Sequence, residues 1–454
     1  MVAAADGYAT LIEELDSIRV HNKVAAMGLV VVRDDRVVYL ATRGLADRAA
    51  KRPIADDAIF RIGSISKMFT GLAAAELAAR GVLDLDQAIS DFATEAMYSN
   101  PWEARYPVTT AQLLEHSAGL TGLIQAEWDY SDPRQLPLSQ TLRMYPQART
   151  LQWRPGLQHS YSNAGAGLAG YVMEKATGKS YESLMRELIF KPLMLKDTSV
   201  LPPALDRLPS GYDSDGVTVI PYWHQIFRPF AAINTSLQDM GIFLRMMIRR
   251  GQLGDRRVFA AKTIERVESP TTTLAARRGL VYGYGLGNYW WLRQGIVFHG
   301  HGGDADGYLS KMAYTRANDS GYFLVITAFQ NTTLRAMQIA IEQYLIQGLR
   351  AEKAPPVYTL SPARRQQILG FYGRTSWRFP DRREQARGET LELIAIDGQL
   401  YTQGDERQRQ RLLAVSESLF RRRQDNRATV FVSSDTDGEI YFQEDSDNFS
   451  KISE

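Results

Sequence analysis

Cysteine is absent from this sequence of 454 residues. Its absence excludes disulfide bonds, a thiolate nucleophile, and zinc or iron–sulfur sites with cysteine ligands. Long apolar runs are also missing, because no stretch approaches the roughly 18 consecutive apolar residues that a membrane-spanning helix requires. The beginning of the chain, from Met1 to Leu15, is acidic and amphipathic rather than signal-like. The sequence therefore predicts a soluble protein without a transmembrane segment.

An excess of charge of one sign is lacking as well. The chain has 53 Lys and Arg residues against 51 Asp and Glu residues, which leaves a net charge of +2. Because no one-signed field is available to attract nucleic acid or anionic lipid, we expect a small-molecule or peptide substrate and no nucleic-acid partner. With 44% hydrophobic and 23% charged residues, the composition is that of an ordinary globular protein.

The length of the chain predicts more than one domain, because single hydrophobic cores seldom grow beyond about 250 to 300 residues. We expect a large domain of residues 1–352, a linker of residues 353–361 and a small domain of residues 362–454. The linker is inferred from the stretch Glu352 to Pro362, which contains three prolines, Pro362 included, and little else that packs.

In the large domain, the apolar pattern predicts strands near both ends and helices between them. A helix over 8–23 precedes two strands, 27–32 and 37–42, joined by a tight turn at Asp34-Asp35. Helical spacing begins at Ser64 and stops at Gly81. Later segments predict three strands and a final helix: 297–298, 311–314, 322–329 and 334–349. This arrangement favours one antiparallel sheet flanked by helices.

The small domain shows short alternating segments separated by turn residues. Ser361-Pro362 predicts the start of a short helix that runs to Leu369. Asp-Gly turns at 397–398 and 437–438 then accompany the predicted strands 391–396, 429–432 and 440–442. We interpret this part of the chain as an antiparallel β domain with a barrel-like form.

The strongest chemical signal is Ser64-Ile65-Ser66-Lys67 at the start of a predicted helix. A Ser and a Lys three residues apart lie on one helix face, so the spacing places an amine beside a hydroxyl. A serine hydroxyl is a poor nucleophile at neutral pH unless a neighbour accepts its proton, and a desolvated lysine can do so or can tune another base. The helix terminus also directs the Ser64 backbone N–H toward a developing oxyanion.

Two further motifs support this interpretation. Tyr161-Ser162-Asn163 precedes a Gly-rich helix, and His301-Gly302-Gly303 follows the apolar strand 296–298. A tyrosine oxygen can relay protons, an Asn amide can donate to a substrate carbonyl, and glycines let a substrate backbone approach a strand closely. A second Tyr-Ser-Asn, at 98–100, precedes a proline in a turn-like region without a following helix, so we favour Tyr161.

The three motifs together resemble the serine β-lactamase, penicillin-binding-protein and family VIII esterase superfamily, over residues 8–350. The resemblance implies an α+β fold: an antiparallel sheet flanked by helices, with a second, all-helical lobe and the site at their junction. It implies that Ser64 becomes acylated, that Lys67 and Tyr161 form the base system, and that Asn163 orients the substrate. The oxyanion hole would use the backbone N–H groups of Ser64 and Asp304, and His116 would be a structural loop residue. Which of the two base residues removes the proton stays open.

The third motif differs from the Lys-Thr-Gly of class C β-lactamases, because a His stands in place of the Lys. The substrate-binding residues implied here are Asn163, His301, Gly302, Gly303 and Asp304. Asp304 and Asp306 add negative charge that would oppose a carboxylate-bearing substrate. We therefore rank peptidase activity, of D-amino-acid or D-Ala-D-Ala type, and esterase activity above weak β-lactamase activity. Relatives with a His-x-Gly motif can send a loop of a C-terminal β domain toward the cleft. Residues 356–454 are expected either to restrict access to the cleft in this way or to serve as a packing or assembly module.

Two alternatives remain. His299, His301, Asp304 and Asp306 place nitrogen and oxygen ligands close together, but with six histidines in the chain and a coherent serine-hydrolase pattern we expect no metal and no cofactor. A penicillin-binding or peptide-binding protein without turnover is the second alternative, and three intact motifs argue against it.

Asn234-Thr235-Ser236 matches a glycosylation sequon. From the resemblance to the family we interpret this segment as a helix N-cap instead. Export to the periplasm or cell envelope is expected, otherwise a cytoplasmic location; the D or L preference and the oligomeric state are not fixed.

Overall fold

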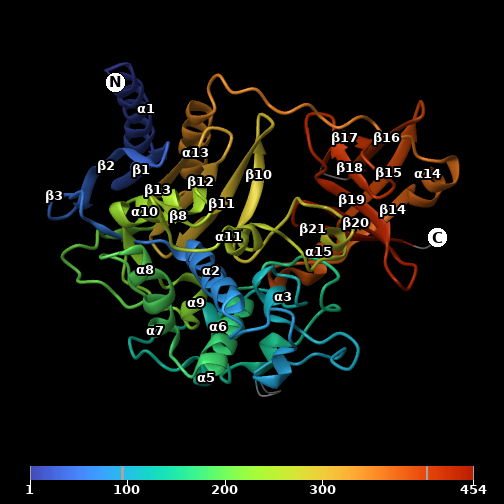
Figure 1. Cartoon of the computed structure of the whole chain (residues 1–454), viewed down its shortest axis with the longest axis horizontal. Helices are drawn as coiled ribbons and strands as arrows, with labels where there is room; N and C mark the ends of the chain where they lie inside the picture. The colour runs from blue at the N-terminus through green and yellow to red at the C-terminus, as the bar shows by residue number, and fades with distance from the viewer. Residues whose placement is uncertain (1, 94–96, 405–406, 453–454) are drawn as a thin grey trace.

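The computed structural model describes residues 2–93, 97–404 and 407–452 (Figure 1). An antiparallel sheet organises the first three quarters of the chain. Within these residues the sheet has the strand order β10-β11-β12-β13-β1-β2-β3. The strands are β1 (Ala26–Arg33), β2 (Arg36–Asp47), β3 (Arg52–Pro53), β10 (Tyr289–Arg293), β11 (Ile296–Ala305), β12 (Tyr308–Thr315) and β13 (Ser320–Ile326). The expected joining of early and late strands is confirmed, because β1 pairs with both β2 and β13.

The first hairpin forms as its sequence predicts. Asp34 and Asp35 both have positive φ angles, 50° and 58°, which a two-residue turn between strands requires. β1 is apolar from Ala26 to Val32 because each of its faces meets a different core. Val30 packs into the core on one side of the sheet and Val31 into the core on the other. A strand covered on both faces reads as a continuous apolar run.

Helices cover both faces of the sheet (Figure 1). α1 (Val2–His21) and α13 (Asn331–Leu345) contribute to one core, and α2 (Ser66–Ala79) and α10 (Leu237–Ile248) to the other. α1 ends two residues before the predicted Lys23, because Lys23 adopts a left-handed φ of 55°. α13 likewise begins and ends earlier than the predicted 334–349.

An all-helical lobe lies below the sheet in the view of Figure 1 and packs against α2. Its helices are α3 (Thr110–Leu114), α4 (Gln125–Trp128), α5 (Leu138–Thr141), α6 (Asn163–Thr177), α7 (Tyr181–Met185), α8 (Lys191–Leu193) and α9 (Arg228–Ala231). Two more helices, α11 (Ala261–Glu268) and α12 (Leu274–Arg277), lead back to β10. The short paired strands are β4 (Ile59–Arg61) with β7 (Asn234–Ser236), β5 (Gly211–Tyr212) with β6 (Val219–Ile220), and β8 (Gln252–Leu253) with β9 (Arg256–Arg257).

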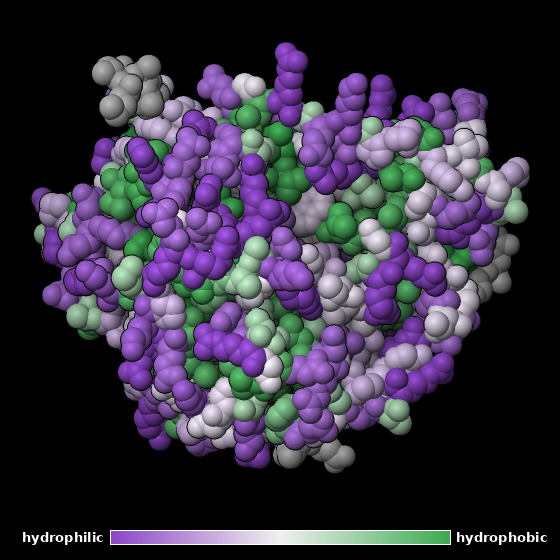
Figure 2. Space-filling view, in the orientation of Figure 1, coloured by the Kyte–Doolittle hydropathy of each residue, from purple (hydrophilic) through white to green (hydrophobic). Residues whose placement is uncertain are grey.

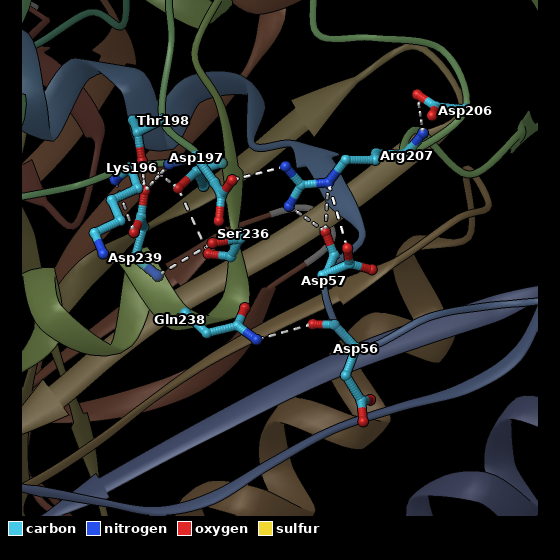
Figure 3. Close-up of polar contacts among 11 residues, drawn as sticks. Asp56, Asp57, Lys196, Asp197, Thr198, Asp206, Arg207, Ser236, Gln238 and Asp239 are labelled. Atoms are coloured by element: carbon cyan, nitrogen blue, oxygen red, sulfur yellow. Dashed lines mark hydrogen bonds and ion pairs between the residues drawn. The ribbon is translucent and has the colours of Figure 1, made fainter.

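A polar network around the start of α10 ties the lobe to the sheet (Figure 3). Ser236 is the N-cap of α10, as predicted, and its side chain accepts a hydrogen bond from the backbone N–H of Asp239 at 3.3 Å. The Asp239 carboxylate accepts from the backbone N–H of Asp197 at 2.8 Å and from the Thr198 hydroxyl at 2.7 Å. These contacts of Asp239 fix the loop after α8 against the helix, and Arg207 pairs with Asp197 within that loop at 2.7 Å.

The C-terminal part is a closed antiparallel barrel, which confirms the predicted β domain. In the described residues its strands are β14 (Gly370–Arg374), β15 (Thr390–Ile396), β16 (Gln399–Gly404), β17 (Arg407–Ala414), β18 (Leu419–Arg422), β19 (Val430–Ser434), β20 (Ile440–Glu444) and β21 (Asp447–Lys451). α14 (Pro362–Ile368) is capped by Ser361 as expected, and α15 (Arg383–Gly388) lies between β14 and β15. Apolar side chains such as Tyr372, Phe420 and Phe442 fill the barrel interior.

Polar contacts hold the barrel against the rest of the chain, and Figure 2 shows the surface hollowed between the two parts on this face. Arg154 pairs with Asp435 at 2.9 Å and with Asp437 at 2.8 Å. Asn448 of β21 donates to the His159 carbonyl oxygen at 2.8 Å. The boundaries at 352 and 361 stay a prediction, and the predicted outer ends, Met1 and Glu454, lie outside the described residues. Over the described ranges, no helix is both long and apolar enough to span a membrane.

Candidate active site

Ser64 lies in a 3-10 turn, Gly63–Ile65, that leads directly into α2. The turn rests against β11 with almost no space between the two backbones. A Cβ on Gly63 would lie 2.5 Å from the Asp304 backbone nitrogen, and a Cβ on Gly303 would lie 2.0 Å from the Ile62 carbonyl oxygen. Gly63 also has a φ of 53°, which favours glycine. Two glycines from distant segments therefore bring the serine beside the strand.

Lys67 stands one turn further along and is buried, with 1% of its surface exposed. Its Nζ lies 3.0 Å from Ser64 Oγ and donates to the Phe230 carbonyl oxygen at 3.0 Å. Burial lowers the pKa of Lys67 well below its ordinary value, the Arg378 cation lowers it further, and Asp304 raises it. Within the described part of the chain no carboxylate forms an ion pair with this nitrogen. The surroundings therefore favour the neutral amine.

Tyr161 comes from the residues just before α6 and meets Ser64 in the cleft. Its hydroxyl is hydrogen-bonded to Ser64, and Lys67 Nζ lies 4.8 Å from the centre of its ring. Burial raises the pKa of Tyr161, and the bond to Ser64 and the Arg378 cation only partly oppose this. The phenol consequently keeps its proton at neutral pH. Ser64, Lys67 and Tyr161 thus converge, as the sequence predicts.

Asn163 is placed differently from the other predicted residues. It is the first residue of α6 after the N-cap Ser162, and it is 3% exposed. Its Oδ1 atom has no hydrogen-bond partner among the described residues, and its side chain does not line the cleft. Its role in orienting a substrate stays a prediction.

The sequence suggested that the His301-Gly302-Gly303 motif follows a short strand. In the structure the motif lies within β11 itself. The strand continues to Ala305 because the Gly residues still pair regularly with β12. Ala305 and Tyr308 are the pair that closes the two-residue hairpin loop between β11 and β12. The two residues of such a closing pair exchange backbone hydrogen bonds, and from there hydrogen-bonded and non-hydrogen-bonded pairs alternate along the ladder. His301 and Gly303 therefore bond to β12, whereas Gly302 and Asp304 direct their backbone groups to the other edge.

That other edge is open at the site. β10 begins at Tyr289, which pairs with Gly300, so no described strand covers Gly302 and Asp304. The backbone N–H of Asp304 consequently faces the cleft next to the Ser64 turn, as the predicted oxyanion hole requires. The open edge can also accept an extended chain as an added strand.

His301 is 3% exposed, and both of its ring nitrogens have partners in the protein. Nδ1 contacts the Gly302 carbonyl oxygen and Nε2 contacts the Tyr284 hydroxyl. Because a carbonyl oxygen only accepts, Nδ1 carries the proton and Nε2 accepts from Tyr284. Burial lowers the pKa of His301 well below its ordinary value, and the nearby Lys67 lowers it further. The ring is therefore neutral and does not supply the cation of a Lys-Thr-Gly motif.

Asp304 turns its carboxyl group into the cleft, where solvent reaches it. Desolvation by the surrounding protein, and then the charge of Asp306, raise the pKa of Asp304 to about 6. The cations Arg378 and Lys67 oppose this rise. Asp306 itself does not line the cleft. The negative charge expected at this end of the site is thus weaker than the sequence alone suggested. Among the described residues, no group of three or more His, Asp or Glu side chains is arranged to hold a metal ion.

The barrel contributes a wall of the cleft, which confirms the expected approach of the C-terminal domain. The segment after β14 carries Trp377 and Arg378 to the site, and the guanidinium of Arg378 lies 4.6 Å from the centre of the Tyr161 ring. The segment is fixed by hydrogen bonds from Gly122 N to the Arg378 carbonyl oxygen at 2.6 Å and from Ser160 Oγ to the Trp377 carbonyl oxygen at 3.0 Å. No described residue forms a hydrogen bond or ion pair with the Arg378 side chain.

His116 holds the loop that presents Tyr161. Its Nδ1 accepts from the Ser162 backbone N–H at 3.1 Å, and its carbonyl oxygen accepts from Ser160 N at 2.7 Å. Its ring packs 4.3 Å from the Tyr161 ring. These contacts agree with the structural role that the resemblance implies. Tyr284, which binds the His301 ring, was missed because no motif marks it.

The fold and this site define a class of serine-dependent acyl-transfer proteins. The family model described as Beta-lactamase matches residues 10–345, so the chain belongs to the β-lactamase family. It is 30% identical over 229 residues to a β-lactamase of Yersinia enterocolitica, covering 49% of this chain and 54% of that protein. It is 31% identical over 193 residues to esterase EstB of Burkholderia gladioli, covering 40% of this chain and 49% of that one. The chain spans about half the length of these curated relatives.

Solved structures share the fold across the whole chain, the barrel included. An octameric penicillin-binding protein homologue from Pyrococcus abyssi superposes with a TM-score of 0.62 at 20% identity, covering 98% of this chain and 100% of that one. SurE, solved with D-Leu, gives a TM-score of 0.62 at 18% identity, covering 100% of both chains. The predicted family and the predicted fold are thereby confirmed.

Proposed function

We propose that this protein is a serine hydrolase that forms an acyl-enzyme at Ser64 and acts on peptide-like substrates. One observation carries the proposal. The Ser64 hydroxyl, with a buried amine of lowered pKa 3.0 Å away, stands at the open edge of β11. A nucleophile with its base lies where an extended substrate backbone can pair.

The chemistry follows from these positions. Ser64 Oγ attacks the carbonyl carbon while its proton passes to Lys67, and the backbone N–H groups of Ser64 and Asp304 stabilise the resulting oxyanion. The proton is then delivered to the leaving nitrogen or oxygen as its bond to carbon breaks. Water hydrolyses the acyl-enzyme by the reverse steps: it attacks the acyl carbon, and Ser64 Oγ leaves and takes back its proton. Lys67 is the base because its pKa is lowered, and Tyr161 is the relay because its pKa is raised.

Peptidase activity is favoured over β-lactam hydrolysis. A peptide main chain can use both outward backbone groups of an open strand edge, whereas a neutral His301 offers no cation for a β-lactam carboxylate. Esterase activity is the second candidate, and the similarity to esterase EstB supports it. The D-Leu in the SurE structure is a reason to test substrates with D residues.

A substrate panel tests the proposal. D-amino-acid p-nitroanilides, L-amino-acid p-nitroanilides, a p-nitrophenyl ester and nitrocefin are compared by initial rates with the wild-type protein. We expect p-nitroanilide turnover, with nitrocefin slower by roughly tenfold or more, because one charge-assisted contact to its carboxylate is missing. Nitrocefin as the best substrate would contradict the peptidase assignment, and ester turnover alone would favour the esterase.

Replacing Arg378 by alanine is expected to move the acid limb of the kcat/KM pH profile to higher pH. Activity needs the neutral Lys67 amine, so it falls as the pH drops through the lowered pKa of that group. Arg378 is one cause of the lowering. Removing its charge raises the pKa of Lys67, and the limb shifts upward.

The profile is measured with a neutral p-nitrophenyl ester at constant ionic strength. Arg378→Lys keeps the charge and should keep the limb in place. Arg383→Ala removes a cation of the same segment that lies over Trp377, 5.5 Å from its ring centre, and should leave the profile unchanged. An unshifted or downward-shifted limb in Arg378→Ala would contradict this electrostatic role.

A further inference from the structure

The open edge of β11 is short. β10 covers the strand as far as Gly300, through the pair with Tyr289, and the hairpin loop begins after Ala305. Between these points, Gly302 and Asp304 are the residues whose backbone groups face the cleft. A substrate chain that adds to this edge as a strand therefore pairs with these residues.

The oxyanion hole sets the register of such a substrate. Every strand pair of this sheet is antiparallel, and we take the substrate to follow the same mode. The residue whose carbonyl oxygen accepts from the Asp304 N–H then donates its own N–H to the Asp304 carbonyl oxygen. The next such pair forms at Gly302, and it involves the second residue after the scissile bond. We call this residue the second leaving-group residue.

The acceptor at Gly302 is already occupied. His301 Nδ1 carries a proton and contacts the Gly302 carbonyl oxygen, which is the atom that an N–H of the second leaving-group residue would need. A carbonyl oxygen has two lone pairs, but a second N–H at the same oxygen is repelled by the partial positive charge of the first. The Gly302 N–H, by contrast, still faces the open edge. Only an acceptor of the substrate finds its partner here.

Tyr284 prevents the His301 ring from turning away. Its hydroxyl donates to His301 Nε2, and its side chain is 7% exposed. The centre of the Tyr284 ring lies 4.5 Å from that of His116 and 5.6 Å from that of Tyr289. Rotation of His301 would break both of its ring contacts and leave a buried nitrogen without a donor, which costs free energy. The ring is therefore held on the Gly302 oxygen.

Other acceptors of the cavity do not replace the Gly302 oxygen. Three carboxyl groups line the cavity, those of Glu115, Asp304 and Asp445. Glu115 pairs with Arg266 at 2.8 Å. Asp445 pairs with Arg422 at 2.8 Å. Asp304 projects from a face of β11, as every strand side chain does, and not along the edge where a substrate backbone pairs.

We propose that His301, held by Tyr284, is a specificity-determining residue that makes the site indifferent to an N–H on the second leaving-group residue. The proposal rests on the proposed function, since it concerns the residues that follow the scissile bond. Leaving groups without this N–H, such as a single terminal residue or one followed by an ester linkage, are accepted as well as ordinary peptides. Recognition of a peptide N–H is confined to the acyl side, at Asp304.

Three thioesters test the proposal. Acetyl-alanyl-thioglycolyl-glycine amide, with the alanyl enantiomer that the substrate panel favours, has one thioester bond, so hydrolysis there is followed as free thiol. Two analogues each replace one N–H by oxygen, either that of the alanyl residue or that of the glycine, which is the second leaving-group residue. We expect kcat/KM of the wild type to fall by roughly tenfold with the acyl-side analogue, the value of one hydrogen bond, and by less than about twofold with the leaving-group analogue.

Variants of His301 and Tyr284 should change the second ratio. In His301→Ala the Gly302 oxygen is free, so the leaving-group analogue should become roughly tenfold worse than the parent thioester. His301→Asn places a side-chain amide where Nδ1 stands and should keep the wild-type ratio. Tyr284→Phe releases the ring and should move the ratio in the direction of His301→Ala, and it serves as the test if His301→Ala fails to fold. Each ratio is taken within one variant, so a general loss of activity does not affect it.

A wild type that discriminates against both analogues equally would overturn the proposal, and so would an unchanged ratio in the folded members of His301→Ala and Tyr284→Phe. Failure of the proposed function is a separate result, seen when none of the thioesters is hydrolysed. The affinities of the same compounds for Ser64→Ala, measured by titration calorimetry, then decide on His301 by the same ratios. Absence of any binding there would also overturn its role.

Discussion

Replacing Ser64 by alanine is expected to lower kcat/KM for every accepted substrate by roughly 10⁴-fold or more, because the variant lacks the atom that forms the acyl bond. The remaining groups of the site cannot substitute for it. Lys67 and Tyr161 both point at the same hydroxyl, and the backbone of the Ser64 turn keeps its place against β11. The measurement is the rate with the best substrate of the panel, under single-turnover conditions.

A covalent probe makes this result specific. A fluorophosphonate should add its mass to the wild type once and should not add it to Ser64→Ala. Ser183→Ala, at a serine of α7 that does not line the cleft, should label and turn over like the wild type. Labelling that persists in Ser64→Ala would mean another nucleophile. Wild type that neither labels nor turns over any substrate would favour a binding protein without catalysis.

Much of the fold was predictable because local and long-range signals agree. The hairpin of β1 and β2 has an apolar run on each side of a turn with two aspartates, and both aspartates tolerate the positive φ the turn needs. The barrel strands alternate around Asp-Gly turns, such as that at Asp397 with a φ of 48°. β10 was missed as a strand, because Tyr289 to Trp291 is a short aromatic run that fits a cleft wall equally well.

The catalytic residues were predictable because each one stands in a short motif with a chemical reason. What the motifs could not show is which edge of β11 is open, since this depends on where β10 begins. Nor could they show Arg378, which lies more than 200 residues after Tyr161 in the chain. The sequence contains many arginines in that region, and only the docking of the segment after β14 onto Gly122 and Ser160 selects this one.

Replacing Lys67 by methionine is expected to lower kcat/KM by roughly 10³-fold, the usual contribution of a general base. Methionine has a similar length, so it removes the amine and keeps the buried packing. The loss should fall on acylation, measured as the rate of fluorophosphonate labelling. Tyr161→Phe, which removes only the relay, should cost less than Lys67→Met if the amine is the base.

The same substitution separates catalysis from stability. A lysine whose folded pKa is lowered binds fewer protons than the unfolded chain, so unfolding becomes harder as the pH rises from that lowered value toward the unfolded pKa of about 10.4. Lys67→Met should abolish this part of the slope of Tm against pH, without a lower Tm at neutral pH, because an amine held without a carboxylate partner costs stability. Lys175→Met, at an exposed lysine, should keep the slope. Equal losses of activity and of Tm in Lys67→Met would instead assign Lys67 a structural role.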